Sequence, residues 1–121
     1  MTGEFRFSFG PWNIHEGADC FGPNVRKSIA FDQKLDLYKD MGFDAVQLHD
    51  DDAVPNLNDL SPAQIGSEAA RLKKRLADAG LIAEFVAPRL WEDPRTVDGG
   101  FTANSASDRQ YALDRLKVSI D

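Results

Sequence analysis

A histidine followed by three aspartates, His49-Asp50-Asp51-Asp52, is the densest group of titratable side chains in the sequence. Histidine changes its charge near neutral pH, and an acid three residues later can fix the tautomer of its ring and raise its basicity. His49 and Asp52 are therefore the candidate pair for proton transfer. The aspartates could instead cap turns and lie in solvent, and the spacing alone favours that structural role.

A metal site is a second possibility for the same segment, since hard cations prefer carboxylate oxygens. A tight site usually takes ligands from separate elements, however, and only this segment supplies acids at high density, so no residue is assigned as a metal ligand. Cys20 is the single cysteine. It cannot form an internal disulfide, and no nearby pair of cysteines or histidines gives it zinc spacing.

Aromatic and basic side chains fall in other expected loops. Trp12, Phe21 and Trp91 lie where exposed aromatic rings would be costly, so they should line a pocket or a subunit contact, or else pack in the core. His15 is a lone histidine in a loop, and such residues are more often solvated than catalytic. Arg89 follows the third apolar run and is a further candidate for a binding site.

The elements that position these residues follow from hydrophobic periodicity. Three short apolar runs at 5–9, 45–48 and 81–86 alternate with helical patterns, which predicts a parallel α/β sheet. The third run is almost wholly apolar, as expected of a strand covered on both faces. Loops at the carboxyl ends of parallel strands build the active sites of such folds, so five candidates should converge there: His15, His49, Asp52, Arg89 and Trp91.

Three helices are expected between and after these strands. The first runs from near Asp32 and ends at Gly42; the second follows the capping box of Ser61 and Gln64 and ends at Gly80. The third begins near Ser105 or Ser107 and directs Leu113, Leu116 and Ile120 toward a core. The sequence stops at Asp121 without a helix stop signal, and three parallel strands leave two unpaired edges. We therefore expect more chain, or a partner.

Composition limits the class of protein. The chain has 121 residues, 42% hydrophobic and 28% charged, which is typical of one soluble globular domain. Its net charge of −6 disfavours nucleic acid, and a basic group within the second helix is interpreted as a solvated face: Arg71, Lys73, Lys74 and Arg75. The sequence contains neither a membrane-length apolar run nor a signal-peptide pattern, so a cytoplasmic protein is expected.

Four segments resemble a known family. FSFGPW, DCFGP, HDDDAVP and DGGFTAN, in this order and at these spacings, are similar to the amino-terminal third of xylose isomerases, and the similarity runs from about Phe5 to the end. The resemblance implies an incomplete (β/α)8 TIM barrel, of which residues 1–121 supply the first three βα units. His49 and Asp52 match the pair that opens the sugar ring. Phe21 matches a phenylalanine that reaches into a neighbouring subunit's active site.

The resemblance also implies an activity and a cofactor. Members of this family are usually tetrameric aldose–ketose isomerases that use divalent metal ions (Mg, Mn or Co) for a hydride shift. Their metal ligands and catalytic lysine lie on later strands, so none is assigned here, and no turnover is expected from this chain alone. His15 and Arg89 depart from the family's pattern. The substrate-binding residues (Trp12, His15, Phe21, Arg89, Trp91) could therefore select an aldose other than xylose.

Two other functions stay open. The chain could be a non-catalytic barrel fragment that pairs its open edges with copies of itself or with a companion chain. It could also be a small receiver-like signalling domain with an acidic phosphoacceptor site. The strand count opposes the receiver, which needs five strands and has shorter loops than this sequence.

Overall fold

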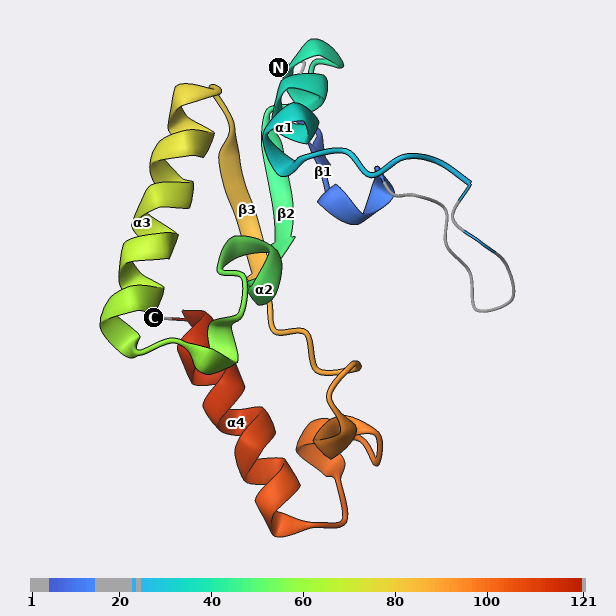
Figure 1. The fold of residues 1–121 in the computed structure, drawn as a ribbon, viewed down its shortest axis with the longest axis vertical. Helices are drawn as coiled ribbons and strands as arrows, with labels where there is room; N and C mark the ends of the chain where they lie inside the picture. The colour runs from blue at the N-terminus through green and yellow to red at the C-terminus, as the bar shows by residue number, and fades with distance from the viewer. Residues whose placement is uncertain (1–4, 15–22, 24, 121) are drawn as a thin grey trace.

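One parallel sheet forms the centre of the fold (Figure 1). The computed structural model describes residues 5–14, 23 and 25–120. Its three strands are β1 (Ser8–Phe9), β2 (Ala45–His49) and β3 (Ile82–Ala87), and they lie in the order β1-β2-β3. Both pairings are parallel, with a register shift between β2 and β3 at Val46/Gln47. The predicted parallel α/β sheet is confirmed.

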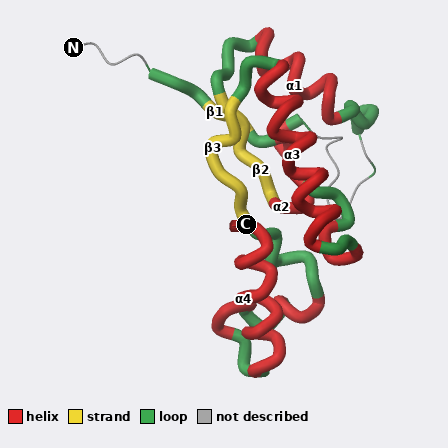
Figure 2. The backbone as a smooth tube through the Cα atoms, turned by 90° about the vertical axis from the view of Figure 1, so that its left-hand side faces the viewer, coloured by secondary structure: helices red, strands yellow, loops and turns green. Residues whose placement is uncertain are grey.

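In the described residues, four α-helices accompany the sheet: α1 (Phe31–Asp40), α2 (Asp50–Ala53), α3 (Pro62–Asp78) and α4 (Ala106–Ile120). Helices α1 and α3 lie on the same side of the sheet (Figure 2), whereas α4 lies beyond the carboxyl ends of β2 and β3 (Figure 1). The described parts of the connections contain 3-10 turns at Pro11–Asn13, Leu57–Asp59, Pro94–Thr96 and Gly100–Thr102. None of the described helices is long and apolar enough to cross a membrane.

The limits of α3 are set by local chemistry. The Ser61 backbone N–H donates to the Gln64 side chain at 2.9 Å, and the Ser61 hydroxyl accepts from the Gln64 N–H at 3.4 Å, which is the predicted capping box. Gly80 follows the helix at φ +68°, a conformation that costs a side chain-bearing residue about 1–2 kcal/mol. Both predicted limits of this helix are confirmed.

The hydrophobic core lies between the sheet and the two helices on its covered face. It contains residues from α1, β2 and α3 and the residue before β3: Leu35, Tyr38, Val46, Leu48, Leu72, Leu76 and Leu81. An ion pair between Arg75 and Asp32 joins α3 to α1 at the edge of this core. This core fixes β2, and with it the residue that ends the strand, His49.

The first strand is shorter than predicted. Residues 5–9 were expected to pair, but only Ser8 and Phe9 do, with Ala45 and Val46. The Asp44 N–H donates to the carbonyl of Phe7 at 3.0 Å, and no described strand pairs with residues before that point. The alternation of aromatic residues starts before the partner strand β2 begins at Ala45, so Phe5 and Phe7 remain exposed.

The third strand and the last helix also differ from expectation. β3 was expected to be covered on both faces, but Ile82, Phe85 and Val86 are each more than a third exposed, because no described strand pairs with its outer edge. In α4, Leu113 and Ile120 are exposed, and Arg115 with the neighbouring Ala112 is buried instead. The reason is an ion pair of Arg115 described below, which turns another face of the helix inward.

Candidate functional site

The carboxyl ends of the three strands meet at one edge of the sheet, as predicted. His49 is the last residue of β2, Arg89 follows β3 by two residues, and Trp12 lies in the 3-10 turn after β1. His49, Asp52, Arg89 and Trp91 all lie at this edge. His15 and Phe21, the other two predicted site residues, lie outside the described part of the chain.

His49 and Asp52 are brought together by a short helix that the sequence did not predict. Residues 50–53 were expected to belong to a loop, but they form α2, and one helical turn returns the carboxylate of Asp52 to His49. Its Oδ2 accepts from the backbone N–H of His49 at 3.1 Å and lies 3.1 Å from the ring Nδ1. Both side chains are less than a quarter exposed. The geometry suits a histidine whose ring is held for proton transfer.

Two tryptophan rings lie against the imidazole. The ring centroid of Trp12 is 4.4 Å from that of His49, and the ring of Trp91 is 4.8 Å away, nearly perpendicular at 77°. Trp12 and Trp91 are 37% and 59% exposed. They therefore form an open aromatic wall beside His49 and are not part of the hydrophobic core.

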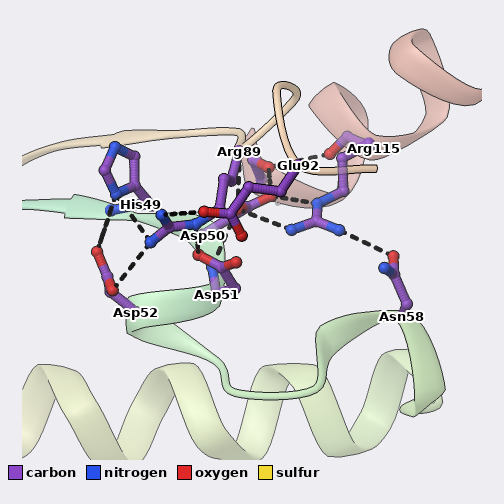
Figure 3. A network of polar contacts seen from close by, with 9 residues as sticks. His49, Asp50, Asp51, Asp52, Asn58, Arg89, Glu92 and Arg115 are labelled. Carbon is purple, nitrogen blue, oxygen red and sulfur yellow. Dashed lines mark hydrogen bonds and ion pairs between the residues drawn. The ribbon is translucent and has the colours of Figure 1, made fainter. Parts of the chain in front are cut away.

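Arg89 connects the acidic segment to the end of β3 (Figure 3). Its Nε donates to Asp51 at 2.7 Å, its Nη1 to Glu92 at 3.2 Å, and its Nη2 to Asp52 at 3.2 Å, with Nη2 also 3.1 Å from the Nδ1 of His49. Burial alone lowers the pKa of this guanidinium, but the hydrogen bond and charge of Asp51 and the charges of Asp52 and Glu92 raise it overall. Arg89 is thus a fixed cation within the site.

Asp50 faces the opposite direction and is buried, with 2% of its surface exposed. Its carboxylate accepts from the Arg115 guanidinium (Nη2 at 2.9 Å), from the Ser119 hydroxyl at 3.0 Å and from the Arg89 backbone N–H at 3.0 Å. Arg115 also donates to Asn58 at 2.9 Å (Figure 3). Burial alone raises the pKa of Asp50, but the bonds from Arg115, Arg89 and Ser119 lower it below its usual value.

Sequence reasoning missed this second network. Arg115 is 65 residues from Asp50 and carries no local motif that marks it as a partner. Arg115 lies three positions after the small Ala112, on the same face of the helix. The leucines on the other face gave a stronger indication of which face would be buried. The network anchors α4 and the β3–α4 connection beside the site.

The described residues do not fit a divalent-cation site. Within the described ranges, no three or more histidine, cysteine or acidic side chains lie where they could hold a metal ion together. The carboxylates of Asp50, Asp51 and Asp52 already bind the guanidinium groups of Arg89 and Arg115. A cation at these oxygens would have to displace fixed positive charges.

A parallel α/β sheet with a His–Asp pair at its carboxyl edge defines the class of fold in which loops after strands carry an active site. No family model matches the chain. The chain is 33% identical over 119 residues to the xylose isomerases of Thermus caldophilus and Thermus thermophilus. These alignments cover 98% of this chain and 30% of each relative. The chain is therefore a segment of the xylose isomerase family, as its four motifs predicted.

Proposed function

We propose that this chain supplies the ring-opening residues and part of the sugar pocket of an aldose–ketose isomerase of the xylose isomerase type. The observation that carries the proposal is the pair His49 and Asp52, with Nδ1 and Oδ2 3.1 Å apart, beside the exposed rings of Trp12 and Trp91. The family relationship supports the same assignment.

The chemistry of ring opening requires a positioned proton donor and acceptor. When a cyclic aldose opens, the anomeric hydroxyl loses its proton, the bond from the anomeric carbon to the ring oxygen breaks, and the ring oxygen gains a proton. In the proposed function His49 exchanges protons with the sugar through its second ring nitrogen, which Figure 3 shows turned away from Asp52. Asp52 orients the ring through its contact with Nδ1 at 3.1 Å, and the backbone N–H of His49 fixes the same carboxylate oxygen.

The pocket wall would be aromatic and cationic. Trp12 and Trp91 offer apolar ring faces to the carbon skeleton of a sugar. Phe21, by family resemblance, and His15 and Arg89, which depart from the family's pattern, would complete the substrate-binding set. Because Arg89 brings a charge to the site, the aldose need not be xylose.

The strand order supports a barrel. In the proposed fold the chain supplies the first three βα units of a (β/α)8 TIM barrel, wound in sequence order with helices on the outer face. A receiver-like domain would instead place β1 between β2 and β3. In the described residues β2 lies in the middle, so the strand order gives the receiver alternative no support.

The uncovered apolar surface beside β3 supports the proposal that other protein completes the barrel. An apolar cavity of about 450 Å³ lies between α3 and β3, with Leu72, Leu76, Ile82 and Val86 among its lining residues. The chain spans only 30% of the length of its relatives. We infer that further protein, either a companion chain or copies of this chain, covers these surfaces. Copies of this chain would not add ligands for the divalent metal (Mg, Mn or Co), so in the proposed isomerase those ligands come from protein outside these 121 residues. The chain alone is then expected not to turn over.

The test begins with native mass spectrometry of the purified chain. A companion of roughly twice its mass would match the missing part of a (β/α)8 barrel. That assembly is then assayed for conversion of a cyclic aldose to its ketose with Mg, Mn or Co added in turn. A complete assembly that converts no aldose with any of these ions would refute the isomerase.

Substitution of His49 tests the ring-opening role separately from the family relationship. His49→Asn should slow conversion of the cyclic sugar by roughly 10²–10⁴-fold, the usual contribution of a positioned acid or base. Asp114→Asn, on the exposed face of α4, is the matched control and should leave the rate unchanged. Undiminished activity in His49→Asn would remove the ring-opening assignment and leave the family relationship standing.

The second candidate is a non-catalytic barrel fragment that pairs with copies of itself or with a companion chain. The exposed apolar residues of β3 and the binding of the acidic side chains by Arg89 and Arg115 favour it. The expected result is then a small stable oligomer of this chain that neither binds nor converts an aldose in the presence of the three metal ions. Conversion of an aldose by the native assembly would contradict it.

A further inference from the structure

The two oxygens of the Asp52 carboxylate have different partners. Oδ2 accepts from the backbone N–H of His49 at 3.1 Å and lies 3.1 Å from the ring Nδ1, whereas Oδ1 accepts from Nη2 of Arg89 at 3.2 Å. The terminal torsion of an aspartate side chain is broad, so the carboxylate rotates at little cost unless both oxygens are bound. The bond at Oδ1 therefore opposes a rotation that would take Oδ2 away from His49.

Arg89 is itself held in place by groups other than Asp52. Its Nε donates to Asp51 at 2.7 Å and its Nη1 to Glu92 at 3.2 Å, and the guanidinium lies over the ring of Trp91, with Cζ 5.5 Å from the ring centroid. Only 18% of the side-chain surface of Arg89 is exposed. Its fork is therefore already oriented when Nη2 meets Asp52, and little side-chain entropy is lost for that bond.

The turn that carries Asp52 is fixed by a separate set of contacts. At the start of α2, Asp50 accepts from Arg115 Nη2 at 2.9 Å and from the Ser119 hydroxyl at 3.0 Å. The backbone N–H of the buried Val54 closes the turn by donating to the carbonyl of Asp50 at 2.8 Å. These contacts do not involve the side chain of Arg89. The turn and the orientation of the carboxylate can therefore be tested separately.

We propose that Arg89 is a positioning residue that holds the Asp52 carboxylate in its orientation toward His49 (Figure 3). The orientation does not depend on which ring nitrogen carries a proton, because the donors from Arg89 and from the His49 backbone always carry theirs. The inference deepens the proposed function and rests on it for its catalytic consequence, since ring opening needs an imidazole of fixed orientation. The orientation itself is a property of the chain without sugar.

The experiment is backbone amide hydrogen exchange, followed by NMR of the chain without sugar. The amide of His49 reports on Oδ2 of Asp52, and the amide of Val54 reports on the turn. Arg89→Met should speed exchange at His49 by on the order of tenfold to a hundredfold, the range expected for a bond to a charged group, and leave Val54 unchanged. Asp52→Ala removes the acceptor and sets the largest increase expected at His49.

Two further variants are compared with Arg89→Met. Arg89→Lys keeps a charge without the fork, so exchange at His49 should fall between wild type and Arg89→Met. Arg71→Met, at an exposed guanidinium on α3, is the matched control and should leave exchange at His49 unchanged. If Arg89→Met does not fold, Arg89→Lys carries the test, with faster exchange than wild type at His49 and none at Val54.

Two results would overturn the proposal. Exchange at His49 that is the same in Arg89→Met and in wild type would show that the carboxylate keeps its orientation without Arg89. An equal increase at His49 and Val54 would show that Arg89 supports the turn as a whole and has no particular influence on the carboxylate.

Activity of the complete assembly separates this inference from the proposed function. Arg89→Met should lower kcat for a cyclic aldose with a smaller change in KM, because a positioning residue acts on the reacting step. Selective exchange at His49 in a chain whose complete assembly converts no aldose would support the role of Arg89 and refute the isomerase. An active isomerase in which Arg89→Met changes neither exchange at His49 nor kcat would refute the role of Arg89 and leave the isomerase standing.

Discussion

Replacement of Asp50 by asparagine tests the central structural claim, that a buried ion pair fixes α4 beside the site. The substitution keeps the size of the side chain and removes its charge. Arg115, with 7% of its surface exposed, would then be a buried cation without a compensating anion. The Ser119 hydroxyl and the Arg89 N–H would also lose a charged acceptor.

The magnitude follows from burial. Removing one partner of a buried pair typically costs about 3–5 kcal/mol, whereas an exposed pair contributes about 0–1 kcal/mol. Domains of this size are stable by about 5–15 kcal/mol, so Asp50→Asn should remove a large part of the free energy of unfolding. The pair formed by Asp114 and Lys117 on the same helix is exposed, and Asp114→Asn is the matched control.

The charge of Asp50 should also make the free energy of unfolding depend on pH. The pKa of Asp50 is lower in the folded chain than its usual 3.8. Its contribution is therefore fully present above about pH 4 and is lost as the pH falls through the folded pKa. Asp50→Asn should weaken the acid dependence of stability in that range, because the substituted side chain does not titrate.

The assay is urea unfolding followed by circular dichroism at neutral pH and at pH values below 4. The expected result is a much lower midpoint for Asp50→Asn at neutral pH, with a smaller difference from wild type in acid. If Asp50→Asn and Asp114→Asn have the same small effect at neutral pH, the pair does not anchor α4 and the reasoning is wrong.

Two further predictions concern the elements that support the site. Leu76→Ala should lower the free energy of unfolding by about 2–5 kcal/mol, because Leu76 is 3% exposed within the core beneath β2; an equal cost for the exposed Leu113→Ala in the same urea titration would contradict this. Ser61→Ala should lower the free energy of unfolding by about 1 kcal/mol, because it removes the cap of α3. Ser67→Ala, at an exposed position on the same helix, is the control, and equal urea midpoints for the two variants would contradict a role of the cap.

Much of the scaffold could be predicted because its signals are local. The capping box at Ser61 and the glycines after two helices act within a few residues, so they read directly from the sequence. The proximity of His49 to Asp52 has the same origin, since residues three apart meet on one turn of helix. The aromatic alternation before Phe9 misled because it says nothing about where the partner strand begins.

The sequence by itself determined the parallel α/β pattern and the limits of α3, and it marked His49 and Asp52 as a candidate pair. Only the tertiary structure decided that Arg115 would pair with Asp50 across 65 residues, and that Arg89 would reach the ring of His49 across 40. The physical reason is that burying a charge is costly unless an opposite charge meets it in the folded state. That requirement selects partners by their position in space, which no local pattern records.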